Sequence, residues 1–177
     1  VLPNPAAADQ PFSGTALRNA QVLAAKGRAG LPFYPDTWDG YPWARERLYD
    51  LSRAAGAGDL IFLTGDSHSF WANRLNDGAG RPAGVELGTA GITSPGDFVE
   101  SGFGEELSLA LDRAFEQHVP EVVWTDNMHH GYVRLDLSHD SAEATFVAVD
   151  TVRSRDFRPF IVNRFEIVRT AEGIDFA

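Results

Sequence analysis

An acid and an imidazole close together are the first sign of chemistry in this sequence. In LIFLTGDSHSFW, residues 60–71, Asp66 and His68 follow a short apolar run and Gly65. Side chains two positions apart in an extended chain project from the same side. The pair can therefore direct a carboxylate oxygen and an imidazole nitrogen to one point, and we expect both to bind one metal ion. A structural interpretation stays open, in which Asp66 caps a helix starting near Ser69 and His68 bonds to a backbone carbonyl.

A second polar stretch, TDNMHHGY at 125–132, lies between two runs typical of strands. It brings Asn127, His129 and His130 into one loop, where binding and catalytic groups are common. An imidazole titrates near neutral pH and can protonate a leaving group. Adjacent histidines in a connection between strands are also common as solvated turn residues, so this alternative stays open.

The stretch WDGYP at 38–42 combines two aromatic residues with an acid. Asp-Gly is a turn signal, and Trp38 could belong to the core, so Asp39 and its neighbours have a purely structural interpretation. Two other histidines have simple local roles: His118 ends a predicted helix, and His139 lies in a predicted hairpin turn.

Composition limits the classes of function. The chain has 177 residues, which is enough for one domain with a substantial core. Its net charge of −10 argues against binding to a nucleic-acid backbone, and it has no run long and apolar enough to span a bilayer. Because it has no cysteine, a metal would have to be bound by His, Asp, Glu, Asn or backbone oxygen.

The elements that must position these residues follow from periodicity. Within an otherwise irregular lead-in, residues 1–35, the stretch ALRNAQVLAAKGRAG could form a helix. A second helix is predicted from Asp39, as cap, to Gly56, with Ala44, Leu48, Leu51 and Ala55 on its apolar face. The run at 60–64 is predicted to be a strand covered on both faces, followed by a short helix and by the strand VELGTA. A further helix is predicted from Glu105 to His118.

After Glu121 the apolar period changes from helical to two. EVVWTD, GYVRLDLS, EATFVAVDT and FIVNRFEIV are four predicted strands of an antiparallel meander. The fold class is therefore mixed α/β, with a helix-covered sheet first and antiparallel strands afterwards.

Five motifs in fixed order carry a resemblance to a known family. They are WDGYPWARERL, LTGDSHSFWANRL, GTAGITSPG, WTDNMHHGYVRLDL and FVAVDTV. From about Leu31 to its end the chain resembles the C-terminal half of the alkaline phosphatase D (PhoD-like) family of calcineurin-like metallophosphoesterases. The resemblance implies a β-sandwich flanked by helices, with residues 36–177 as the C-terminal part of a metallophosphatase domain.

The resemblance also implies an activity and a site. Members hydrolyse phosphate monoesters and diesters with a dinuclear or multinuclear metal site, in which calcium and iron are typical and zinc or manganese occur in relatives. By similarity Asp66 and His68 are metal ligands, and His129 and His130 are catalytic. Trp38, Asp39, Trp71 and Asn127 would line the substrate site.

The sequence departs from the family at its start, where it has none of the N-terminal metal motifs. A two-metal site commonly needs roughly six ligands, and this chain supplies two good ones. We therefore expect the chain to be the C-terminal portion of a longer or two-chain enzyme that pairs with a complementary N-terminal segment. Family members are often periplasmic or secreted, and the chain itself carries no export signal.

Two rival functions stay open. The chain could be a non-catalytic processed fragment or interaction module on the same scaffold, or it could belong to a metal-dependent hydrolase of another ester. Metal content and activity toward phosphate esters distinguish these possibilities from the phosphatase.

Overall fold

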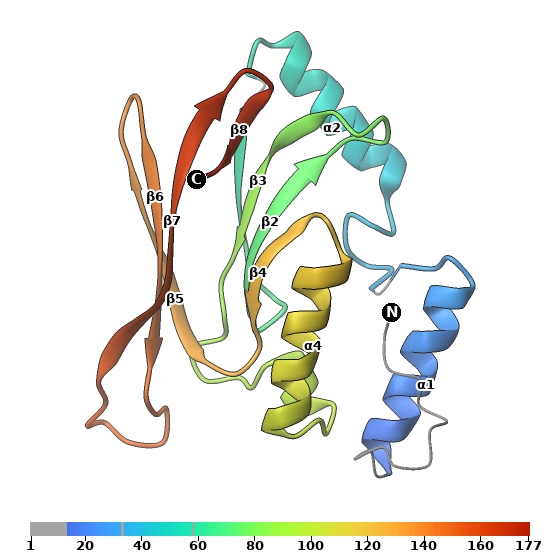
Figure 1. Ribbon diagram of the computed structural model, residues 1–177, viewed down its shortest axis with the longest axis vertical. Helices are drawn as coiled ribbons and strands as arrows, with labels where there is room; N and C mark the ends of the chain where they lie inside the picture. The colour runs from blue at the N-terminus through green and yellow to red at the C-terminus, as the bar shows by residue number, and fades with distance from the viewer. Residues whose placement is uncertain (1–13, 33, 58) are drawn as a thin grey trace.

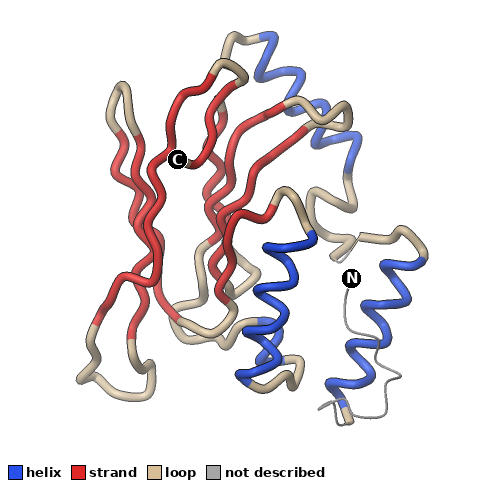
Figure 2. Tube along the Cα trace, in the orientation of Figure 1, coloured by secondary structure: helices blue, strands red, loops and turns tan. Residues whose placement is uncertain are grey.

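The computed structural model describes residues 14–32, 34–57 and 59–177. Two four-stranded sheets face each other, and the helices gather on the outer side of the first sheet (Figures 1 and 2). This arrangement confirms the mixed α/β class with a helix-flanked β-sandwich. The helices are α1 (Thr15–Arg28), α2 (Pro42–Ala54), α3 (Asp97–Glu100) and α4 (Glu105–His118). The strands are β1 (Leu60–Thr64), β2 (Phe70–Asn76), β3 (Pro82–Gly88), β4 (Val122–Asp126), β5 (His130–Leu137), β6 (Ala142–Val149), β7 (Pro159–Thr170) and β8 (Gly173–Phe176).

The first sheet has the order β1-β3-β2-β4. Strand β1 runs parallel to β3, and β2 runs antiparallel to both β3 and β4. The prediction of a helix near Ser69 was wrong, because β2 begins at Phe70 and the five residues before it form a tight turn. The placement of EVVWTD in the meander was also wrong, since β4 pairs with β2 across the sandwich from the meander.

The second sheet is the predicted antiparallel meander, in the order β5-β6-β7-β8. Its hairpin between β5 and β6 contains His139, as expected. The strand β8 was not predicted, because GIDF is only four residues long.

The main core lies between the two sheets. In β6, Ala144, Phe146 and Ala148 recur at every second position and are fully buried against the first sheet. The small alanines leave room for the ring of Phe146, which meets Phe70 edge-on with centroids 5.6 Å apart and Trp124 at 4.8 Å. Burial of one such ring contributes about 1.5–3 kcal/mol.

Helix α2 starts at Pro42, whose missing N–H is not needed in the first turn. The predicted cap was wrong: Asp39 accepts a hydrogen bond from Arg45 Nη1 at 2.8 Å, and no side chain caps the helix. The predicted apolar face was also displaced, since Tyr49 is buried whereas Leu51 is 49% exposed. The side chain that packs inward is therefore aromatic and lies off the aliphatic stripe.

A second, smaller core joins three helices. Ala16 of α1, Phe98 of α3 and Leu111 of α4 are buried together with Phe103. Asn19 of α1 also donates a hydrogen bond to the Ser101 carbonyl at 3.2 Å. The helix predicted within residues 1–35 is thus confirmed, while residues 1–13 lie outside the described part of the chain. The domain boundary at residue 35 stays a prediction.

Strand β1 differs from its prediction as a strand covered on both faces. Among the described residues it pairs only with β3, so it is an edge strand, and Leu63 is 65% exposed. Its apolar sequence is therefore only half covered within this chain. None of the helices in the described ranges is long and apolar enough to cross a membrane.

Candidate active site

The turn after β1 carries the two predicted metal ligands. Asp66 and His68 both adopt left-handed backbone conformations, with φ of 71° and 53°. Such conformations are uncommon in residues other than glycine, although Asp and His are enriched among the exceptions. The argument from strand alternation does not apply here, because β1 ends at Thr64 and both residues lie in the turn. Asp66 is exposed and His68 is half-buried.

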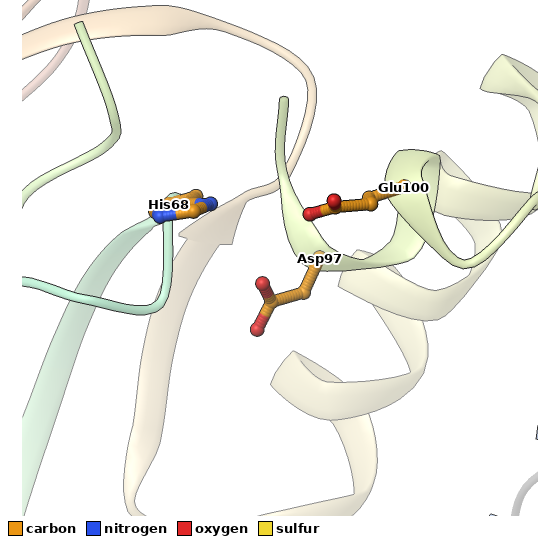
Figure 3. Close-up of side chains that lie close together, drawn as sticks. All are labelled: His68, Asp97 and Glu100. Carbon is orange, nitrogen blue, oxygen red and sulfur yellow. The ribbon is translucent and has the colours of Figure 1, made fainter. Parts of the chain in front are cut away.

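His68 instead meets two carboxylates from α3. One ligand atom each of His68, Asp97 and Glu100 lie within 4.8 Å of one another. Figure 3 shows the Glu100 side chain extending toward the imidazole, with Asp97 beside it. Asp66 is not a member of this group. Sequence reasoning missed Asp97 and Glu100, although their spacing of three residues places two carboxylates on one side of a helical turn.

Hydrogen bonds orient two members of this group. The His68 Nδ1 atom lies 3.2 Å from the Pro95 carbonyl oxygen. An Nδ1–H donated to that carbonyl leaves Nε2 as the ring atom that can bind a metal, which is the usual outer hydrogen bond of a metal-binding histidine. The Tyr34 hydroxyl donates to Asp97 Oδ2 at 2.8 Å. Burial, and then the hydrogen bond to Asp97, raise the pKa of Tyr34, so its hydroxyl stays protonated.

The loop 91–96 connects this group to the second predicted one. His68 contacts Pro95, and a hydrogen bond joins His130 to the neighbouring Ser94 backbone. The Gly131 N–H also donates to the Gly91 carbonyl at 3.3 Å. The two imidazoles thus contact neighbouring residues of one loop, although His68 precedes this loop in the sequence and His130 follows it.

His129 forms a close pair with the acid at the end of β4. Its Nδ1 lies 2.6 Å from Asp126 Oδ2, and Asp126 Oδ1 accepts the backbone N–H groups of Met128 and His129. The hydrogen bond to Asp126 raises the pKa of His129, and burial opposes this effect. The imidazole therefore carries a proton over a wider pH range than a free histidine, with Nε2–H able to face a ligand.

His130 has the opposite character. Burial lowers its pKa, the charge of His129 lowers it further, and the hydrogen bond to Ser94 partly offsets both effects. The pKa values of these two adjacent histidines are thus shifted in opposite directions, so that His129 favours the protonated form more than His130 does. Such a pair suits an acid and a neutral hydrogen-bonding group in one site.

The predicted substrate-binding residues fall into two groups. Asn127 is 1% exposed, and its side chain bonds to Ser69, Asp112 and Thr125. Trp71 is half-buried, donates to Ser67 Oγ at 3.1 Å and meets Phe115 edge-on. Both side chains contact the turn at residues 65–69, and their predicted contact with substrate stays a prediction.

Trp38 and Asp39 precede α2 and are exposed. Asp39 pairs with Arg45, and no hydrogen bond or ion pair of the described residues links either one to the two histidine groups. Their predicted contact with substrate stays a prediction.

Comparison with known proteins decides the family. The model of the PhoD-like phosphatase family matches residues 7–146. The chain belongs to this family. Alkaline phosphatase D of Bacillus subtilis (strain 168) is 28% identical over 134 residues, which cover 71% of this chain and 22% of that protein.

A solved structure described as "Structure of PhoD" shares the fold. It superposes with a TM-score of 0.60 at 19% identity, over 80% of this chain and 26% of that one. The PhoD-like chain thus spans about a quarter or less of the length of these relatives.

Proposed function

We propose that this chain is the C-terminal portion of a metal-dependent phosphatase that hydrolyses phosphate monoesters and diesters. Membership of the PhoD-like family supports the phosphatase chemistry. The observation that carries the proposal is the convergence of His68, Asp97 and Glu100 at the end of β1, close to the loop that also contacts His130.

The residues present fit a divalent or trivalent cation. Bonds from a metal to nitrogen or oxygen ligands are about 2.0–2.5 Å long, so two ligand atoms on opposite sides of one ion are about 4–5 Å apart. The three ligand atoms lie within 4.8 Å, which satisfies this limit. Carboxylate oxygens suit calcium and manganese, and an imidazole suits iron and zinc. Calcium and iron are the metals that we propose, with Asp66 as a further ligand.

The histidines of the second group supply the proton chemistry. His129 is oriented by Asp126, and in its protonated form it can donate a proton from Nε2 to the leaving-group oxygen or stabilise charge on the phosphoryl group. The lowered pKa of His130 favours its neutral form, which can accept a proton or donate one hydrogen bond. The chemistry that a bound metal adds is polarisation of the phosphoryl oxygens. A chain with a net charge of −10 otherwise offers little positive charge to a phosphate ester.

A complementary N-terminal segment is part of the proposal. The exposed edge of β1 offers unpaired backbone groups next to the exposed Leu63. Such a segment would add a strand there and bring further metal ligands to the same end of the sheet. Export to the periplasm or the medium also belongs to this proposal, and cell fractionation tests it.

The test uses the complete protein and the chain alone. We expect the complete protein to bind metal and to hydrolyse p-nitrophenyl phosphate and bis-p-nitrophenyl phosphate, and to leave p-nitrophenyl acetate intact. The chain alone is expected to be inactive and to regain activity when the N-terminal segment is added. A complete protein with full metal content but no activity toward either phosphate ester would refute the proposal and favour an interaction module.

A further inference from the structure

Buried polar side chains concentrate behind the candidate site. Seven polar or charged residues of the described chain are buried, and four of them form one connected group: Ser69, Asp112, Thr125 and Asn127. Polar groups removed from water destabilise the fold unless they are paired. Four of them in contact therefore indicate a network with a defined task.

Asp112 is the charged member of this group. It lies on α4 and is 6% exposed, and no lysine, arginine or histidine of the described residues pairs with it. By contrast Asp77, which is equally buried, has Arg53 at 2.9 Å and Arg81 at 2.7 Å. Burial raises the pKa of Asp112 to about 6 against the hydrogen bonds from Asn127, and Asp126 and Glu116 add to the rise.

Asn127 joins Asp112 to the turn that carries His68. Its amide donates to Asp112 Oδ1, its backbone N–H lies 3.3 Å from Asp112 Oδ2, and its Oδ1 accepts the Ser69 hydroxyl at 2.5 Å. The two carboxylate oxygens thus face two donors of one residue, which fixes the orientation of that amide. Among the described residues, Ser69 is the one whose side chain donates to this amide oxygen.

Both halves of the site depend on this contact. Ser69 directly follows His68, whose left-handed conformation persists only where surrounding contacts hold it. Asn127 directly follows Asp126, the partner of His129. The buried carboxylate of Asp112 is therefore linked by hydrogen bonds to the two segments that carry the imidazoles.

We propose that Asp112 is a positioning residue for this site: through Asn127 and Ser69 it sets the placement of His68 and of the Asp126–His129 pair. The proposal rests on the proposed function for its effect on catalysis, but the placement of the imidazoles is independent of it. Asp112 has no hydrogen bond to either histidine group, and acts through the intervening residues Asn127 and Ser69.

The test replaces Asp112 by Asn in the complete protein. D112N keeps the shape but turns one acceptor into a donor that faces a donor of Asn127. We expect kcat/KM for p-nitrophenyl phosphate to fall by about 10- to 100-fold, since a displacement of about 1 Å can cost that much. The imidazole NMR resonances of His68 and His129 should shift in the same variant.

The matched control is Asp77→Asn, a buried carboxylate at the opposite end of the first sheet. D77N should lower the melting temperature at least as much as D112N, but should keep kcat/KM within two-fold and leave both imidazole resonances in place. Unchanged resonances and unchanged kcat/KM in D112N would overturn the proposal. So would an equal loss of activity in D77N.

A second variant covers the case in which D112N does not fold. Ser69→Ala removes the hydroxyl that donates to Asn127 Oδ1 and that also lies 3.1 Å from the Ser67 carbonyl oxygen, and it should move the His68 resonances and lower kcat/KM by about 10-fold. No change in S69A would again overturn the proposal. If the wild-type protein hydrolyses no phosphate ester while the resonances move in D112N, the positioning role stands and the proposed function fails.

Discussion

Gly96 is the position where the smallest change should have the largest effect on the site. It is the N-cap of α3 with φ of −60° and ψ of 150°, a conformation that alanine also adopts. A Cβ there would lie 2.2 Å from the Asn127 carbonyl oxygen and 3.4 Å from Ser69 Oγ. Since contacts under 3.0 Å are essentially never seen, the two segments must separate by about 0.8 Å.

This separation sets the expected magnitudes for Gly96→Ala. Overpacking of a tight contact costs about 1–3 kcal/mol, which lowers the melting temperature of a chain this size by roughly 2–4 °C per kcal/mol. The displacement moves Asp97 away from His68 and separates loop 91–96 from Asn127. We therefore expect kcat/KM to fall by about 100-fold and metal affinity to fall with it.

Two other glycine variants serve as controls for Gly96→Ala. Gly104 is the N-cap of α4 with φ of −72° and has no atom within 4 Å of a built Cβ, so Gly104→Ala should match the wild type. Gly84 of β3 lies opposite Leu60, the first residue of β1, and a Cβ there would come within 2.0 Å of the Leu60 carbonyl oxygen, so Gly84→Ala should lower stability alone. Full activity and metal binding in a folded G96A protein would refute the reasoning.

Three further variants test the site and the core. His68→Ala should remove bound metal and activity together, as measured by elemental analysis and p-nitrophenyl phosphate hydrolysis, and full metal content would contradict its assignment as a ligand. Because the folded pKa of His129 is raised above 6.5, its pair with Asp126 stabilises the protein fully below the unfolded pKa, and this contribution disappears as pH rises through the folded value. Asp126→Asn should abolish that part of the dependence of melting temperature on pH, and an unchanged profile would show that the pair contributes nothing. Phe146→Ala should lower the free energy of unfolding by about 3–5 kcal/mol in a denaturant titration, and a loss under 1 kcal/mol would contradict the central place of this ring in the core.

Local pattern could predict the elements in which a regular spacing of apolar residues continues over many positions. Helix α4, with Leu111 facing inward, and the meander from β5 to β7 follow directly from periods of 3.6 and two residues. The sheet to which β4 belongs could not be predicted, because EVVWTD alternates equally well in either sheet.

Local pattern also found the two segments that carry the histidines, but it did not find their partners. Asp97 and Glu100 follow a loop whose path depends on contacts with His68, Asn127 and Gly131 from other parts of the chain. Asp112 gave no signal at all, since a single acid on a helix is usually exposed. The burial of Asp112 can be recognised only from the packing of α4 on β4 in the structure.

The turn at residues 65–69 shows why spacing alone could not assign the metal ligands. Alternation requires extended chain, and β1 ends at Thr64, before either candidate ligand. Beyond that point two left-handed residues set the directions of the side chains, so that His68 faces α3 and Asp66 does not join it. Asp66 is the exposed member of the pair and lies just past the end of the edge strand β1. Contacts within this chain therefore set the position of His68, and we propose that the role of Asp66 depends on a complementary segment added beside β1.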